Sequence, residues 1–210
     1  MQAKKQTRDA EATKAAFIAA AETLFSRHGF AGTTLDMLAA ETSANKALVS
    51  YYFGSKEGLY DQVIAAVVGA VLGDLARLLR ANADPEKNFR AYIRALAHAL
   101  GRHASFPALL MREYIEGSMQ EREAPFREVA QFFRLTKEHY DAGYRAKLFR
   151  KVDPHLLHLS IIDPLSHFII AARARAGAIH LMRGEISDPD LAAFIAHHEK
   201  MIIAGLRRAD

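Results

Sequence analysis

The chain has 210 residues, of which half are hydrophobic and a quarter are charged. This composition is typical of a globular protein with one large domain or two small ones. The formal net charge of +4 permits an acidic partner without requiring one. The chain has no cysteine, which excludes disulfides, thiolate metal ligands and cysteine nucleophiles and is typical of a reducing compartment.

We expect neither an export signal nor a membrane segment. The first eleven residues, MQAKKQTRDAE, lack the apolar core of a signal peptide. The longest apolar run, residues 63–73, is shorter than the about 20 residues that span a bilayer. We therefore expect a cytoplasmic protein with no membrane partner.

Residues 8–41 have the pattern of two helices. Apolar residues within 8–28 recur at three- and four-residue spacing and form one stripe: Phe17, Ile18, Ala21, Leu24 and Phe25. Gly29 is suited to a left-handed C-terminal position, with Phe30 packing back on the helix. A short helix at about 34–41 should follow, because Thr33 and Asp36 have the spacing of a capping box.

A polar turn and a third short helix come next. Residues 42–45, TSAN, are small and polar, which is typical of a turn. Asn45 is a suitable N-cap for a helix over 46–52, Gly54 would end it, and Ser55 would cap a long helix running to about residue 81. Two short helices separated by a tight turn form a helix-turn-helix, which we place at about residues 34–53.

Prolines mark helix starts in the rest of the chain. The relevant steps are Asp84-Pro85, Ser105 ahead of Pro107, Asp153-Pro154 and Asp188-Pro189. They predict helices over 85–103, 107–117, 125–142, 154–172 and 189–206, and Pro164 should kink or split the fourth of these. Since no alternating strand pattern is found, we predict an all-α protein with an N-terminal domain at 1–54 and a larger helical domain at 55–210.

The third short helix has an apolar and a polar side. Val49 and Phe53 lie four residues apart and should pack on the preceding helix. Tyr52 could reach a phosphate, and Lys56 adds charge to the start of the next helix, where free backbone N–H groups favour anions. The outward positions would be Lys46, Ala47, Ser50 and Tyr51. This pattern favours DNA binding; the alternative is an ordinary core helix.

Residues 20–60, AAETLFSRHGFAGTTLDMLAAETSANKALVSYYFGSKEGLY, resemble the N-terminal domain of TetR-type transcriptional regulators. The resemblance lies in the phenylalanine-glycine pattern, the Thr-Thr pair, the Tyr-Tyr-Phe end and the Ser-Lys-Glu step. It implies an all-α homodimeric repressor without enzymatic activity or a cofactor. Such a protein would bind a palindromic double-stranded DNA operator and leave it when a small-molecule effector occupies the C-terminal domain.

The resemblance also implies the DNA contacts. By position, the phosphate contacts would be Thr33, Thr34, Tyr52 and Lys56, and the groove contacts would be Asn45, Lys46, Ala47, Leu48, Ser50 and Tyr51. The chain departs from the family where Ala47-Leu48-Val49-Ser50 replaces a common Gly-Thr-Leu-Tyr. We expect few hydrogen bonds to bases and an apolar contact from Leu48 to a thymine methyl. The basic residues Lys4, Lys5 and Arg8 lie on a polar N-terminal arm, which is more often solvated than bound in a minor groove.

Two apolar helices of the C-terminal domain are candidates for a dimer interface. The predicted helices at 154–172 and 189–206 carry broad apolar stripes that a monomer would have difficulty burying. Paired with those of a second chain, they would form a four-helix interface. The candidate residues are Leu165, Phe168, Ile169, Phe194, Ile195, Met201 and Ile202. The alternative is that both stripes face the core of their own domain.

The middle helices are candidates for an effector pocket. Its lining would include Leu110, Met111, Tyr114, Phe133 and Tyr140, although aromatic and methionine residues at helical spacing are more often core. A rival hypothesis is a helical metal-binding protein or enzyme that uses the histidines. His155, His158, Asp163 and His167 are close in sequence, but Pro164 disrupts their common facing and no His-Glu-x-x-His motif is present, so we expect no metal site.

Overall fold

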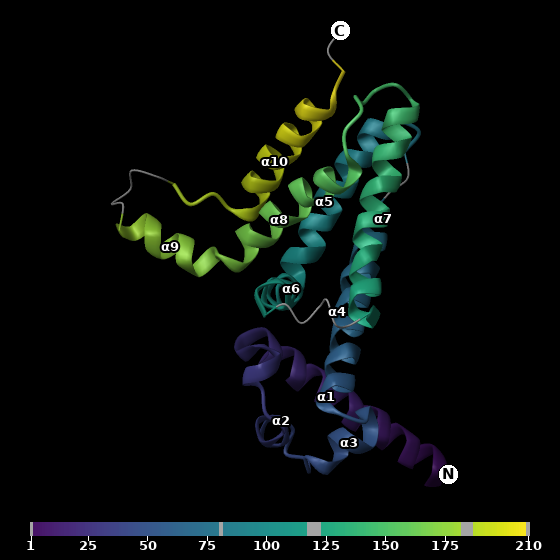
Figure 1. Cartoon of the computed structure of the whole chain (residues 1–210), viewed down its shortest axis with the longest axis vertical. Coiled ribbons are helices and arrows are strands. Elements are labelled where there is room, and N and C mark those ends of the chain that lie inside the picture. The colour runs from purple at the N-terminus through teal and green to yellow at the C-terminus, as the bar shows by residue number, and fades with distance from the viewer. Residues whose placement is uncertain (1, 80–81, 117–122, 182–186, 209–210) are drawn as a thin grey trace. The chain divides into compact units, whose positions relative to one another are not determined.

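The computed structural model describes residues 2–79, 82–116, 123–181 and 187–208, with the side chains of 2–9, 116 and 123–126 left out. The basic side chains of Lys4, Lys5 and Arg8 therefore lie outside the described residues. Across this described part the chain forms ten helices and no strand, which confirms the all-α prediction (Figure 1). The helices are α1 (Gln2–Gly32), α2 (Leu35–Thr42), α3 (Ala47–Phe53), α4 (Lys56–Leu78), α5 (Pro85–Arg102), α6 (Ser105–Glu116), α7 (Glu123–Arg145), α8 (Pro154–Ile170), α9 (Ala172–Leu181) and α10 (Leu191–Leu206).

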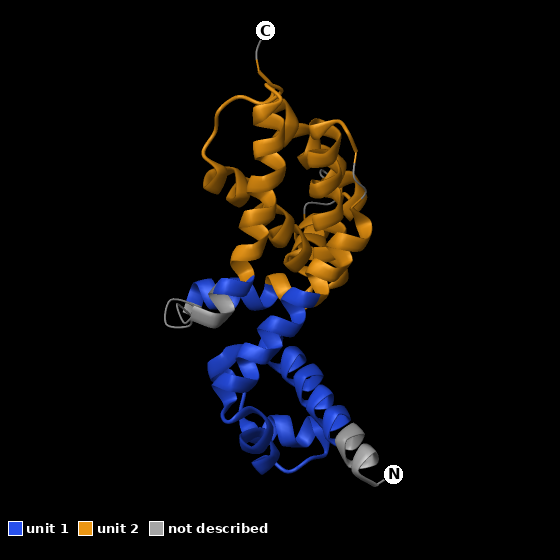
Figure 2. Ribbon diagram, turned by 90° about the vertical axis from the view of Figure 1, so that its right-hand side faces the viewer, with its two compact units in different colours: residues 1–69, 108–128 blue, residues 70–107, 129–210 orange. Residues whose placement is uncertain are grey.

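The chain divides into two compact units, coloured separately in Figure 2. Unit 1 comprises Met1–Gly69 and Ala108–Glu128, and unit 2 comprises Ala70–Pro107 and Val129–Asp210. The helix α4 contributes its first part to unit 1 and its last part to unit 2. Most of α6 belongs to unit 1, although the sequence pattern placed it with the C-terminal domain.

Unit 1 is built around aromatic side chains of α1, α3 and α4. Phe17 meets Phe53 edge-on with ring centroids 6.2 Å apart, and Phe25 meets Tyr60 at 4.9 Å. Phe30 stacks on Phe25 at 5.9 Å, directly after Gly29 takes a positive φ of 73°. The chain therefore turns back at Gly29 as the sequence suggested, although α1 resumes and ends at Gly32.

Unit 2 has its core along α5, which packs against α8 and α10. The buried side of α5 carries Phe89, Tyr92, Ile93, Leu96 and Leu100. Phe89 also lies 5.6 Å from the ring of Phe149. The ring of Phe149 covers Gly143 so closely that a Cβ at Gly143 would lie 2.2 Å from it.

Two of the four predicted helix starts, at Asp84 and Asp153, are confirmed as N-caps, whereas α6 begins at Ser105 itself and not at the predicted residue 107. Asp84 Oδ1 accepts hydrogen bonds from the amides of Glu86 and Lys87, and Asp153 Oδ1 accepts from the two amides after Pro154. The start of the last helix was predicted wrongly, because Asp190 caps α10 and Asp188 instead pairs with Arg175 at 2.6 Å.

The predicted break at Pro164 is also in a different place. Pro164 lies inside α8 without dividing it, and the helix ends at Ile170. A separate helix, α9, follows after Ala171 at a bend of 67°. Neither Gly nor Pro marks this bend. The predicted helix therefore ran past it to residue 172, into the start of α9.

The helix α4 is long and apolar enough to cross a membrane by length and composition. The bent pair α8 and α9 passes the same test only if both are taken as one span. Core helices of soluble proteins have the same properties, and half of the apolar stretch of α4 is buried in protein. The residues that recur every four positions along α4 are all buried: Leu59, Val63, Val67, Val71 and Leu75.

Candidate nucleic-acid interface

The start of α2 is fixed by Thr34. Its hydroxyl oxygen accepts a hydrogen bond from the amide of Met37 at 3.2 Å, so Thr34 is the N-cap. The capping box predicted for Thr33 is wrong, because Thr33 is buried and its hydroxyl donates to the carbonyl of Gly29 at 2.8 Å. We therefore leave Thr33 out of the proposed DNA contacts, whereas the exposed Thr34 remains among them.

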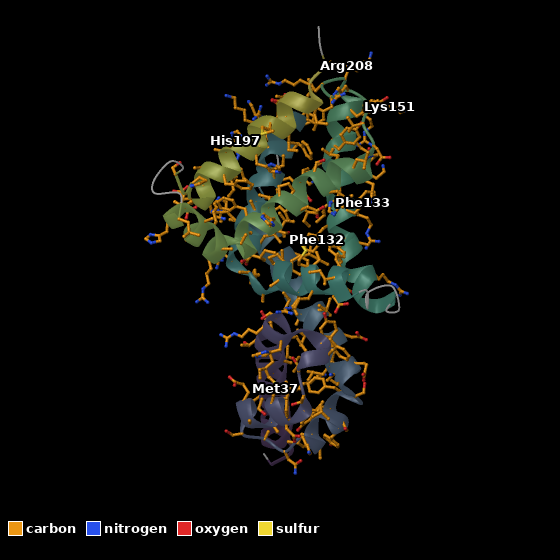
Figure 3. All side chains as sticks on the ribbon, turned by 60° about the vertical axis from the view of Figure 1, so that its left-hand side comes forward. Met37, Phe132, Phe133, Lys151, His197 and Arg208 are labelled. Atoms are coloured by element: carbon orange, nitrogen blue, oxygen red, sulfur yellow. The ribbon has the colours of Figure 1, made fainter. Side chains whose placement is uncertain are left out.

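The turn between α2 and α3 is tightly held by local hydrogen bonds. Ser43 takes a left-handed conformation with φ of 52°, and the amide of Ala44 donates to the carbonyl of Ala39 at 3.2 Å. Asn45 Oδ1 accepts from the amide of Ala47 at 2.8 Å, as expected of an N-terminal capping side chain. Residues 43–46 thus join two short helices in helix-turn-helix geometry. Met37, labelled in Figure 3, marks the first of them.

The outer face of α3 is polar and accessible. Val49 and Phe53 are buried, which confirms the predicted inner face. Leu48 and Tyr52 are half-buried, and the side chain of Tyr51 is 79% exposed. Ala47 and Ser50 of α3 are also exposed, as are Asn45 and Lys46 directly before the helix. This is the arrangement that reading a major groove requires, because the inner face anchors the helix and the outer face carries the donors.

One interaction on this face was not visible in the sequence pattern. Lys46 Nζ forms an ion pair with Asp36 Oδ1 at 2.8 Å, and both side chains are more than half exposed. The pair joins the first turn of α2 to the residue before α3. Its two members are ten positions apart, so no helical period indicates their contact.

The junction between α3 and α4 is compact. Gly54 ends α3 with φ of 77°, and Ser55 Oγ accepts from the amide of Gly58 at 3.1 Å. A Cβ at Gly58 would lie 2.1 Å from the carbonyl oxygen of Phe53, so this position requires glycine. The N-terminus of α4 therefore follows α3 directly and presents backbone N–H groups suited to an anion.

Lys56, at the start of α4, is engaged within unit 1. Its Nζ donates to the carbonyls of Phe30 at 2.9 Å and Thr33 at 3.0 Å, and it lies 4.2 Å from the ring centroid of Phe30. These bonds use two of the three N–H donors of the ammonium. These bonds connect α4 to the segment between α1 and α2. One N–H group of the Lys56 ammonium remains for the predicted phosphate contact.

Comparison with known proteins identifies this arrangement. Residues 17–63 match the family model described as bacterial regulatory proteins, tetR family. The chain is 40% identical over 110 residues to the HTH-type transcriptional repressor SCO4008 of Streptomyces coelicolor, covering 52% of each chain. It is 32% identical over 139 residues to the HTH-type transcriptional repressor Rv3405c of Mycobacterium tuberculosis, covering 66% of each.

The chain belongs to the TetR family. A crystal structure of a TetR family regulator from Marinobacter aquaeolei has the same fold, with a TM-score of 0.74 and 16% identity over 98% of this chain and 100% of the other. PfmR from Thermus thermophilus aligns with a TM-score of 0.67 and 19% identity over 91% and 99%. The matched region spans only about half the length of the first curated relative. The relatives' names describe transcriptional repressors and not enzymes.

The residues predicted to form a dimer interface divide into two groups in the structure. Leu165 and Ile195 are buried within one chain, which removes them from a proposed interface. Phe168 is also largely covered, because its ring stacks on Phe194 at 4.1 Å. The accessible members are Met201, which is 60% exposed, and the half-buried Ile169, Phe194 and Ile202. Leu156 belongs to the predicted apolar stripe at 154–172 but not to the seven candidate residues; it is 64% exposed and lines the same α8–α10 groove as Met201 and Ile202.

The proposed effector-pocket residues are not brought together within one unit. Leu110, Met111 and Tyr114 belong to unit 1, whereas Phe133 and Tyr140 belong to unit 2. Tyr140 has a different use, since its hydroxyl accepts from the amide of Val152 at 3.0 Å and lies 3.2 Å from the carbonyl of Arg150. This bond holds the segment after α7. The effector site of this TetR-family chain therefore stays a prediction.

One of the clustered histidines, His158, belongs to a chain of polar contacts within unit 2. His158 Nδ1 lies 2.9 Å from Thr136 Oγ1, which in turn lies 2.8 Å from the hydroxyl of Tyr92. Burial lowers the pKa of His158 to about 4 and raises the pKa of Tyr92. In the part of the chain that the structure describes, no three His, Asp or Glu side chains are grouped to hold a metal ion.

A set of contacts made by α6 was also missed by the sequence pattern. Arg112 Nε donates to the carbonyl of Ser26 at 3.0 Å, and its Nη2 donates to the carbonyl of Arg27 at 2.5 Å. The neighbouring Glu113 is buried and accepts from the hydroxyl of the equally buried Tyr60. Within unit 1, α6 is therefore attached to the end of α1 and to α4.

Proposed function

We propose that the chain is a cytoplasmic transcriptional repressor that binds a palindromic DNA operator as a homodimer and leaves it when a small molecule binds. The observation that supports DNA binding most directly is the exposed polar face of α3, anchored by Val49 and Phe53 and preceded by a hydrogen-bonded turn. The repressor relatives support the regulatory role.

In this proposal α3 lies in the major groove. Lys46, Ser50 and Tyr51 would supply the polar contacts to base edges, and Leu48 would contact a thymine methyl. Asn45 and Ala47 flank them at the start of the helix. Thr34 at the start of α2, Tyr52 at the end of α3 and the N-terminus of α4 would contact phosphates on either side. The phosphate contacts set the register, and the few donors on α3 carry the sequence preference.

Dimerisation would use the α8–α10 groove. Leu156 and Met201 expose apolar surface there in the single chain, and the half-buried Ile202 lines the same groove. Pairing α8 and α10 with those of a second chain would cover this surface in a four-helix interface. Two recognition helices would then read half-sites about one DNA turn, 34–36 Å, apart.

Release would follow from a population shift between a DNA-competent and an effector-bound conformation. The contacts of Arg112 and Glu113 make α6 part of the unit that carries α3. A ligand that favours another position of α6 would therefore also disfavour the DNA-bound arrangement of that unit.

The proposal is tested by selecting bound sequences from a random pool of duplex DNA. We expect a palindromic consensus, retarded as a complex with two chains, whose affinity falls steeply with salt concentration. We expect a guanine near Lys46 and a thymine near Leu48 in each half-site. Recovery of sequences without a consensus, at an affinity equal to that for unselected DNA, would contradict the proposal.

A further inference from the structure

The ion pair between Asp36 and Lys46 lies on the surface that faces DNA in the proposed function. Asp36 is in the first turn of α2, next to the exposed N-cap Thr34. Lys46 directly precedes α3, and its Nζ is 2.8 Å from Asp36 Oδ1. The lysine that should read a base is thus held by an acid from the neighbouring helix.

Folding does not account for this pair. The side chains are 77% exposed at Asp36 and 58% exposed at Lys46, and ion pairs this exposed contribute little to stability. A carboxylate in the first turn of α2 interacts favourably with the helix dipole, and it needs no lysine nearby to do so. The turn itself is already held by the backbone of Ser43 and Ala44 and by the side chain of Asn45. The contact of Lys46 with Asp36 is therefore additional to what the fold requires.

On a DNA-binding face, the two charges would have opposite effects on affinity if they were not paired. A carboxylate beside Thr34, which is placed to meet a phosphate, repels the DNA backbone. A free lysine at the start of α3 would bind any nearby phosphate and strengthen binding to every sequence alike. The pair weakens both tendencies, because each charge partly offsets the field of the other. The other ammonium N–H groups of Lys46 stay available beside α3.

We propose that Asp36 is a specificity-determining positioning residue that acts through Lys46. It restrains the ammonium group so that Lys46 contributes to base recognition and adds little to sequence-independent phosphate binding. The effect of Asp36 is to lower affinity for random DNA more than affinity for the operator. This inference rests on the proposed DNA-binding function and deepens it.

The experiment compares two duplexes of equal length, one selected by the wild-type chain from a random pool and one with the same bases in scrambled order. The full-length variants are Asp36→Asn, Lys46→Met and the double variant, with Glu41→Gln as the matched control. Glu41 is an exposed acid at the other end of α2, so its replacement removes the same charge from the same helix. Affinities are measured from 50 to 300 mM salt, and thermal unfolding is followed for each variant.

We expect Asp36→Asn to raise affinity for the scrambled duplex by about 3- to 30-fold and to make its salt slope steeper by about one. Affinity for the selected duplex should rise less, so the ratio of the two affinities should fall at least about threefold. In the Lys46→Met background the same substitution should leave the ratio unchanged. Glu41→Gln should raise both affinities by similar small factors and leave the ratio unchanged.

Equal effects of Asp36→Asn and Glu41→Gln on the two affinities would overturn the inference, because they would show that Asp36 acts only through the net charge of α2. A fall in the ratio of the two affinities that persists in the Lys46→Met background would also overturn the inference. If Asp36→Asn lowers the unfolding temperature, Asp36→Ser replaces it, since serine is also favourable at this end of a helix. A wild-type chain that binds both duplexes equally would instead overturn the proposed function itself, so the two failures are distinguishable.

Discussion

At the scale of single residues, Lys56 has one observed role inside the protein and one proposed role at DNA, and a sequence motif cannot separate the two. The structure shows its ammonium on the carbonyls of Phe30 and Thr33, whereas the family resemblance assigns it to a DNA phosphate. A charged hydrogen bond contributes about 1.5–3 kcal/mol, so the internal contacts alone are enough to retain a lysine here.

Replacing Lys56 by methionine tests both tasks. We expect the free energy of unfolding to fall by about 1–3 kcal/mol in urea titrations, because two carbonyls lose a charged donor. Lys56→Arg should recover most of this loss. If the third N–H also holds a phosphate, the salt slope of operator binding should drop by about one in Lys56→Met. An unchanged stability would contradict the structural contact, and an unchanged slope would leave Lys56 as a purely internal tie.

His158 gives unit 2 a pH-dependent stability. Burial lowers its pKa from 6.5 to about 4, so the unfolded chain binds a proton more readily than the folded chain between these values. Stability should therefore be constant above about pH 7 and fall as the pH decreases from 6.5 to 4, by on the order of 2–3 kcal/mol from this residue.

The matched variant for this prediction is His158→Gln, which keeps a hydrogen-bonding partner for Thr136 but does not titrate. Urea titrations at pH 7.5, 5.5 and 4.5 should show a smaller loss of stability for the variant than for the wild type. Parallel losses in both proteins would assign the acid sensitivity to other groups.

At the scale of elements, α6 shows how most of a helix can belong to a different unit from the helix before it in the chain, since α5 lies in unit 2. Arg112 and Glu113 attach it to α1 and α4, and neither contact can be read from the period of α6. An arginine and a glutamate near the end of a helix are expected at the surface, whereas here the carboxylate is buried against Tyr60.

Removing the Arg112 contacts should loosen α6 within unit 1. We expect Arg112→Ala to increase hydrogen exchange at the backbone amides of residues 109–115, because the guanidinium no longer bonds the carbonyls of Ser26 and Arg27. Arg173→Ala, on the exposed side of α9, is the matched control and should leave these amides unchanged. Equal protection in the two variants would show that the Arg112 bonds do not hold α6.

The elements that were predicted correctly have local causes. The caps Asp84 and Asp153, the glycine at position 54 and the inner face of α3 depend on neighbours within one helical turn, so a sequence pattern contains them. The start of α9 has no proline, glycine or cap to mark it. The choice between Thr33 and Thr34 depends on which hydroxyl is buried, and the Asp36–Lys46 pair depends on the turn conformation between two helices. These are tertiary properties.

At the scale of the whole molecule, the α8–α10 groove should decide whether the chain acts as a dimer. Leu156 and Met201 are the most suitable probes, because both are exposed in the single chain and a charge there disturbs no core. We expect Leu156→Glu together with Met201→Glu to give a folded monomer in sedimentation at micromolar concentration. Operator affinity should fall at least about 100-fold, because one half-site provides only part of the contacts.

The control for this prediction is Leu78→Glu, another exposed leucine, on α4 and outside the groove. It should remain dimeric and bind the operator normally. A wild-type chain that already sediments as a monomer at that concentration would exclude this interface, and a dimeric double variant would place the interface on another surface.

The contact of Gly58 with the carbonyl of Phe53 has a mechanical consequence. With no room for even a methyl group at this junction, we expect α3 and the first turn of α4 to move together. The 23 residues of α4 are about 35 Å long, so a tilt of about 5° moves one end by about 3 Å relative to the other. That displacement is comparable to the rise of about 3.4 Å between successive base pairs. A flexible hinge would absorb such a tilt, whereas we expect this junction to pass it on to α3, the helix proposed to lie in the major groove.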